Sequence, residues 1–105
     1  MREIKFRAWQ DYGDGRKYML YDRDDLVEFF DATLGDPIMQ YTGLKDSKGV
    51  EIYEGDIIKY LSSYYGIVKF YNGSFVRGND NGYADIDGEN SEVIGNIYEN
   101  PELLK

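Results

Sequence analysis

The side chains that could carry out chemistry in this 105-residue chain are carboxylates, tyrosines, lysines and hydroxyls, because the sequence contains no His and no Cys. Their absence excludes thiol nucleophiles, disulfides, the usual zinc ligands and any catalytic triad built on His. A hydrolase with two carboxylates, or a metal site with oxygen ligands, stays chemically allowed. The carboxylates are therefore the first candidates for a site.

Acidic residues outnumber basic ones by 20 to 12, which gives a net charge of −8. Seven acids and no Lys or Arg lie between residues 79 and 104. Asp85 and Asp87 could supply the first two ligands of an EF-hand loop, but Gly88 stands at the fourth position instead of the sixth. Asn96 also replaces the bidentate Glu that closes such a loop. The pattern favours solvated turn residues, and we expect no catalytic residue, no metal and no cofactor.

The 11 tyrosines could stack on the bases of a single-stranded nucleic acid. Such a site also needs a basic groove, whereas the Lys and Arg residues are scattered singly and the net charge has the wrong sign. Tyrosines half-buried on strands are the better interpretation, and we expect no nucleic-acid partner. Tyr64 and Tyr65 follow two serines and form the one aromatic pair expected on a loop, so they are the candidate contact patch.

Short apolar segments separated by turns rich in Gly, Asn and Asp must position these residues. The pattern predicts a mostly β fold, a small and partly open SH3-like barrel with an N-terminal hairpin and one short helix. We expect a single domain over residues 1–105. The predicted strands cover residues 4–9, 17–21, 57–61, 66–71 and 92–98.

Two local features sharpen this prediction. Asn72-Gly73 lies between two strand segments, and both residues tolerate the positive φ of a type I′ hairpin turn. Since Phe70 and Phe75 flank this turn and Trp9 ends an alternating strand, we expect all three in the core. Gly95, inside the last strand, is expected to mark a bulge or a close approach of another segment.

Residues 25–34 have apolar positions at helical spacing, with Asp25 and Glu28 placed as in a capping box. The competing interpretation is a strand over residues 26–30, because Val and two Phe favour it. The sequence favours the short helix. A second helical turn is expected at the end, with Asn100 as its N-cap and Pro101 in its first position.

No apolar run is long enough for a signal peptide or a membrane span. We therefore expect a protein of the cytoplasm that does not bind membranes.

Three stretches, residues 1–9, 39–58 and 93–104, resemble the YopX-like proteins of bacteriophages and prophages. The resemblance implies a mostly β fold and a phage or prophage origin, hence the cytoplasm of a bacterial host. It implies no activity and no functional residue.

The sequence thus favours an accessory protein that is not an enzyme and that acts through protein contacts or self-association. The two-sided apolar strands around Ile57-Ile58 and Ile67-Val68 favour a homo-oligomer, since one small sheet does not bury both faces. One alternative is an acidic inhibitor that imitates nucleic acid and occupies a host DNA-binding protein. The other is a carboxylate- or metal-dependent enzyme.

Overall fold

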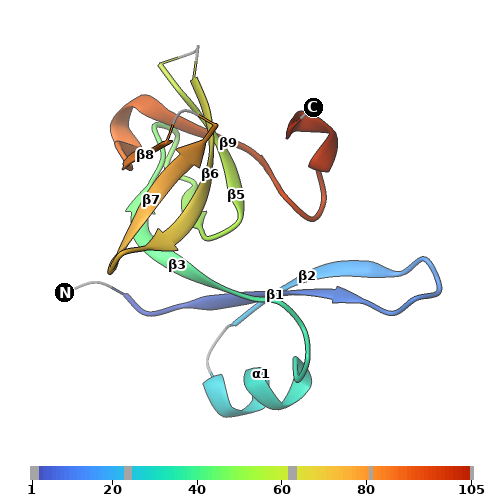
Figure 1. The fold of residues 1–105 in the computed structure, drawn as a ribbon. Coiled ribbons are helices and arrows are strands. Elements are labelled where there is room, and N and C mark those ends of the chain that lie inside the picture. Colours follow the sequence, from blue (N-terminus) through green and yellow to red (C-terminus); the bar gives the residue numbers. More distant parts are fainter. Residues whose placement is uncertain (1–2, 23–24, 62–63, 81, 105) are drawn as a thin grey trace. The chain divides into compact units, whose positions relative to one another are not determined.

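The computed structural model of the chain describes residues 3–22, 25–61, 64–80 and 82–104. Contacts group the chain into two compact units, Met1–Tyr41 and Thr42–Lys105. The structure is mostly β, with one α-helix and a curled half-barrel sheet, which confirms the predicted fold class (Figure 1). No helix in the described residues is long and apolar enough to cross a membrane.

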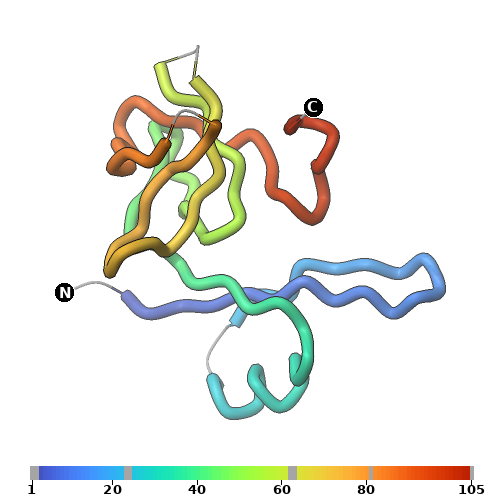
Figure 2. Tube along the Cα trace, in the orientation of Figure 1, coloured from blue at the N-terminus to red at the C-terminus, as the bar shows by residue number. Residues whose placement is uncertain are grey.

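The first unit is a three-stranded antiparallel arrangement. Strand β1 (Phe6–Asp11) pairs on one side with β2 (Lys17–Tyr21) and on the other with the first residues of β3 (Ile38–Lys45). The β1–β2 hairpin predicted from the sequence is confirmed, and it forms the long blue hairpin of the tube in Figure 2. A turn from Tyr12 to Arg16 closes it, with the Tyr12 N–H donating to the Arg16 carbonyl.

Helix α1 (Leu26–Ala32) confirms the helical interpretation of this segment. The Asp25 carboxylate caps it by accepting a hydrogen bond of 3.1 Å from the Glu28 N–H. Phe29 is buried, and the ring of Phe30 meets that of Phe6 edge to face at 5.3 Å. Aromatic packing against β1 therefore outweighs the β propensity of these residues.

The second unit is a five-stranded antiparallel sheet in the order β8-β7-β6-β5-β9. Figure 1 shows these strands bending around one another. The last residues of β3 precede β4 in the chain, and the 3₁₀ helices η1 and η2 flank β9. The bounds are β4 (Glu51–Tyr53), β5 (Asp56–Tyr60), β6 (Tyr64–Tyr71), β7 (Ser74–Asn79), β8 (Gly82–Asp85), η1 (Gly88–Asn90), β9 (Ser91–Asn96) and η2 (Pro101–Leu104).

The core of this unit is small and aliphatic. Ile52, Ile58 and Val68 are buried against one another, with Ile86 and Val93 packed at the margin. The turn between β6 and β7 has φ of 55° at Asn72 and 88° at Gly73, so the predicted type I′ hairpin is confirmed.

Phe70 does not belong to the core, contrary to the sequence-based prediction. It is 56% exposed, and Phe75 is only partly buried, as is Trp9 of the first unit. The core on this face ends at Val68, and Phe70 lies two residues closer to the hairpin turn. There the Phe70 ring packs edge to face on Phe75 at 5.0 Å, which shields part of each ring without burying either.

The last strand and the C-terminal turn follow the prediction with one correction. The β5–β9 register shifts beside Ile57, and a Cβ on Gly95 would meet the side chain of Asn100 at 2.6 Å, so Gly95 marks both a bulge and a close approach. Pro101 opens η2 as predicted. The Asn100 side chain, however, accepts from the Asn96 N–H at 3.2 Å and so points back to β9 instead of capping η2.

Candidate functional site

The outer edge of β9 is closed by the turn that follows β3. Asp46, which is 6% exposed, accepts hydrogen bonds from the N–H groups of Lys48 and Val50 at 2.8 and 2.9 Å. Its other carboxylate oxygen accepts from the Val93 N–H of β9 at 2.9 Å. The Ser47 N–H donates to the carbonyl of Ser91, also in β9, at 2.9 Å. We call this arrangement the Asp46 plug.

These N–H donors favour the ionised form of the Asp46 carboxyl. Burial by itself raises the pKa of the carboxyl, but the backbone N–H groups of Val93, Val50 and Lys48 stabilise the carboxylate, and the net effect is a lowered pKa. The plug therefore has a structural role, because its carboxylate satisfies backbone N–H groups of its own turn and of β9. The same holds for Asp56, which accepts from the Tyr53 N–H at 2.8 Å.

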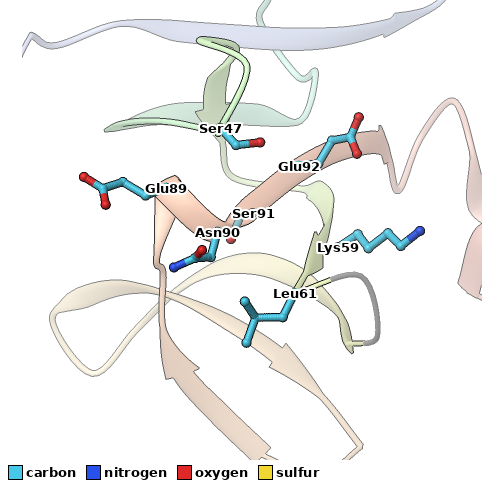
Figure 3. Close-up of a pocket in the computed structure, with 7 residues that line it drawn as sticks. All are labelled: Ser47, Lys59, Leu61, Glu89, Asn90, Ser91 and Glu92. Atoms are coloured by element: carbon cyan, nitrogen blue, oxygen red, sulfur yellow. The ribbon is translucent and has the colours of Figure 1, made fainter.

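A polar hollow of about 360 Å³ lies beside the plug, between the ends of β5 and β9 (Figure 3). Its lining residues are Ser47, Lys59, Leu61, Glu89, Asn90, Ser91 and Glu92. Figure 3 shows the carboxylates of Glu89 and Glu92 pointing away from one another. Glu92 instead makes an ion pair of 2.7 Å with Lys48. The side chains therefore do not converge as acid and base on one reacting atom.

The seven acids between residues 79 and 104 do not meet at one point. Asp87 precedes η1, and its carboxylate accepts from the Asn90 side chain at 2.8 Å. Glu99 accepts from the Asn96 side chain at 2.9 Å, on the turn after β9. In the described part of the chain no three acidic residues are grouped so that they could hold a metal ion.

Tyr64 and Tyr65, the candidate contact patch, lie at the start of β6 and not on a loop. The two serines before them are outside the described residues. Both rings are about half exposed, and they point to opposite faces because they are neighbours on a strand. Tyr64 packs against Tyr60 on one face, and Lys59 lies 6.0 Å from the Tyr65 ring on the other.

Tyr65 instead shares its face with two other tyrosines. Tyr83 of β8 lies opposite Gly78 of β7, which lies opposite Ile67 of β6. The Tyr83 ring stacks on the Tyr71 ring, with 4.4 Å between the ring centres. Lys69 lies 5.9 Å from the centre of the Tyr83 ring. Tyr65, Tyr71 and Tyr83, together with Lys59 and Lys69, are called the tyrosine surface below.

Gly78 is what allows Tyr83 to lie flat on the sheet. A Cβ at this position would come within 2.7 Å of the Tyr83 ring. The diagonal from Tyr71 to Tyr83 passes over Val76, which is buried although Lys69 and Asp85, opposite it on the two neighbouring strands, are exposed. The stacked rings are therefore a cover for Val76 as well as an exposed aromatic surface, each ring being about half accessible.

A second, smaller hollow of about 200 Å³ adjoins the edge strand β8. Its lining residues are Tyr64, Tyr65, Gly66, Arg77, Asn79, Gly82, Tyr83 and Ala84. The Arg77 guanidinium stacks on the Tyr60 ring at 4.0 Å and donates to the Asp85 carbonyl at 2.9 Å. This hollow joins the predicted Tyr64-Tyr65 pair to the strand that ends the sheet.

Sequence reasoning missed this surface, although a signal was present. Residues 57–79 contain Lys59, Lys69 and Arg77 and not one Asp or Glu, so β6 and β7 form a cationic, aromatic segment in an acidic chain. Strand β8 was missed because Gly82-Tyr83-Ala84-Asp85 is short and follows a cluster of turn residues.

The comparisons with known proteins agree with this architecture. The crystal structure of a protein from Enterococcus faecalis is similar with a TM-score of 0.63 and 26% sequence identity, over 100% of both chains. No curated protein matches. The family model described as YopX protein matches residues 9–105, which is most of the sequence. The chain therefore belongs to the YopX protein family.

Proposed function

We propose that this chain is a phage or prophage accessory protein that acts in the host cytoplasm through protein contacts and catalyses no reaction. The observation that carries the proposal is the edge strand β8, which ends the sheet beside the tyrosine surface. Backbone N–H and C=O groups at a sheet edge are ready to pair with another extended chain.

The side chains around β8 suit a protein interface. Tyrosine is enriched in such interfaces because it offers apolar area together with a hydroxyl. Tyr65 and Tyr83 are 49% and 51% exposed, and a lysine ammonium lies near each ring. Half-exposed rings with nearby cations can exclude water from a contact while keeping it polar at its rim.

The two alternatives have less support. An enzyme needs acid and base groups that converge, whereas Glu89 and Glu92 diverge in the polar hollow (Figure 3). An imitation of nucleic acid needs a continuous row of carboxylates, whereas Glu92 is paired with Lys48 and Asp87 accepts from Asn90 beside η1.

A photo-reactive amino acid placed at Ala84 tests the proposal in phage-producing host cells. We expect protein adducts, assigned by peptide mapping, that form from position 84 and disappear when Tyr83→Lys is added. The control places the same group at Val50, which does not belong to β8. Val50 is 48% exposed, about as much as Tyr83 at 51%. Absence of adducts, equal yields from both positions, or adducts to nucleic acid would overturn the proposal.

A further inference from the structure

Arg77 of β7 is a cation whose side chain is fixed by neighbours that carry no charge at the point of contact. Its guanidinium stacks on the Tyr60 ring at 4.0 Å, and its Nε–H donates to the Asp85 carbonyl at 2.9 Å. Arg16 and Lys48 form ion pairs at 2.9 and 2.7 Å, whereas Arg77 forms none with a described residue. The N–H groups on its two terminal nitrogens, Nη1 and Nη2, therefore have no acceptor in the described part of the chain.

This guanidinium lines the hollow of about 200 Å³ beside β8. Small residues flank it on both neighbouring strands. Ala84 of β8 lies opposite Arg77 with only a methyl group, and a Cβ on Gly66 of β6 would come within 3.3 Å of the Arg77 Cβ. No Asp or Glu lines the hollow, and residues 57–79 contain neither. The hollow thus combines space with a cation that no local carboxylate neutralises.

We propose that this hollow, called the Arg77 site below, binds a carboxylate of the partner protein. The inference rests on the proposed function and names the chemistry that the partner presents, an acidic side chain or a C-terminal carboxylate. The planar fork of a guanidinium fits the two oxygens of a carboxylate with two parallel hydrogen bonds. Since the stacking on Tyr60 and the bond to Asp85 already fix this fork, little side-chain freedom is lost on binding.

The charge around Arg77 favours a carboxylate over a phosphate group. A phosphate monoester carries about two negative charges at neutral pH, and its binding sites usually gather several donors. Lys69 is next to Val68 on β6, and Val68 is the residue opposite Arg77, so the Lys69 side chain lies on the other face of the sheet. One guanidinium in a chain of net charge −8 is therefore matched to a ligand with a single charge.

Two tyrosines at the hollow decide what kind of segment carries the carboxylate. The rings of Tyr64 and Tyr83, which are 58% and 51% exposed, line the same hollow as Arg77. Apolar groups packed against these rings would exclude water from the ion pair, and hydrogen bonds are stronger where water is excluded. The site therefore suits a carboxylate on an otherwise apolar segment better than a free carboxylate in solution.

An NMR titration of the ¹⁵N-labelled full chain with three peptides tests the proposal. Acetyl-Thr-Val-Glu-Val-Thr-amide has one side-chain carboxylate, the same peptide with Gln in place of Glu has none, and the Gln peptide without the amide has only a terminal one. We expect one or both carboxylate peptides to shift the signals of the Arg77 Nε–H and the Ala84 N–H at millimolar concentration. The uncharged peptide should leave them in place.

The pattern across these peptides identifies the source of the carboxylate. A shift with the Glu peptide alone assigns an acidic side chain, and a shift with the terminal carboxylate alone assigns a chain end. No shift with either, equal shifts with all three peptides, or tighter binding of inorganic phosphate would overturn the proposal.

Two variants separate the fork from the charge. Arg77→Lys keeps the positive charge but lacks the planar fork, so we expect the carboxylate peptide to bind at least about fivefold more weakly. Lys69→Gln is the matched control, because it removes a cation from the other face of the sheet, and it should bind as the wild type does. Circular dichroism should confirm that both variants are folded. Equal affinities of the wild type and Arg77→Lys, or equal weakening in both variants, would overturn the Arg77 site.

The cross-linking experiment at position 84 distinguishes this inference from the proposed function. A failed titration together with protein adducts from position 84 would remove the Arg77 site and leave the proposed function standing. Absence of adducts would remove the proposed function, and the titration would then decide by itself whether the hollow binds a carboxylate.

Discussion

The two edge strands of the five-stranded sheet differ in whether another segment of the chain bonds to their outward-facing backbone groups. At β9, Val93 donates to the carboxylate of Asp46, a residue 47 positions earlier in the chain, and Ser91 accepts from the Ser47 N–H. At β8, the backbone pairs only with β7 among the described residues, and the Arg77 side chain of β7 donates to the Asp85 carbonyl. A new strand can therefore be added at β8 but meets occupied hydrogen-bonding groups at β9.

The difference shows how a sheet edge is closed without another strand. One carboxylate and one N–H make the hydrogen bonds that a sixth strand of this sheet would make. The carboxylate must be buried to do this, and burial is tolerated because three N–H groups donate to it. The β8 edge has the tyrosine surface beside it instead of a plug, as the proposed protein interface requires.

The largest effect is expected from Asp46→Ala, which removes the plug. Three N–H groups lose their acceptor. A fully buried unsatisfied donor costs about 1–3 kcal/mol, and these partly buried donors cost less because water can replace the carboxylate. We expect a loss of about 3 kcal/mol in the free energy of unfolding, measured with urea. The variant should also associate more readily than the wild type, because β9 becomes a second open edge.

Asp11→Ala is the matched control for that variant. Asp11 also ends a strand and caps a turn, but its carboxylate is exposed. Among the described residues it accepts only from the Gly13 N–H, at 2.9 Å, and Lys17 approaches it to 4.0 Å. We expect a loss of at most about 1 kcal/mol. Equal losses at positions 11 and 46 would contradict the structural role of the plug.

Two Gly→Ala variants compare the edges directly. A Cβ on Gly88 would collide with the backbone carbonyl oxygen of Lys45, so η1 would have to move away from β3 and carry Ser91 with it. The collision at Gly78 is with the Tyr83 ring, which can rotate outward. We expect Gly88→Ala to lower the free energy of unfolding by about 2 kcal/mol, as in overpacked cores. Gly78→Ala should cost less than half as much, and the reverse order would contradict the assignment.

The lowered pKa of Asp46 predicts a sensitivity to acid. The unfolded chain binds this proton with a pKa of about 3.9, and the folded chain binds it only at lower pH. The stabilisation is therefore complete above the unfolded pKa and is lost as the pH falls through the folded pKa. In urea titrations between pH 7 and pH 2, the difference between the wild type and Asp46→Ala should shrink toward the acid end. A difference that stays constant would show that the Asp46 carboxyl has the same pKa in the folded and unfolded chains, contrary to the lowered pKa.

Much of the fold was predictable because local signals decide it. The Asn72-Gly73 turn, the Asp25 cap and the alternation before Trp9 each act within a few residues, and all three elements formed as expected. Burial was less predictable, since whether Phe70 is covered depends on where the core of Ile58 and Val68 ends.

The candidate site was only partly predictable. Tyr64 and Tyr65 were recognised as a patch, but their neighbours on β7 and β8 lie more than ten residues later in the sequence, and β8 carried no periodic signal. The Asp46 plug could not be foreseen either. Its role depends on Val93, and a pairing over 47 residues leaves no trace in local propensity.

The smallest effect is expected at the surface of the plug, from Lys48→Gln. The Lys48 ammonium lies 2.7 Å from the Glu92 carboxylate, and both side chains are largely solvated. The hydrogen bond to Glu92 and then its charge raise the pKa of Lys48 above the ordinary value. The stabilisation is thus present at neutral pH and is lost as the pH rises through the raised pKa.

Exposed pairs of this kind contribute little, so we expect a loss near the limit of detection at low salt. It should vanish at about 1 M salt, where the Debye length is about 3 Å. Lys45→Gln is the control, since the described residues offer Lys45 no ion pair, and it should change nothing at either salt concentration. A loss in Lys48→Gln as large as in Asp46→Ala would mean that the ion pair, and not the buried carboxylate, closes the edge of β9.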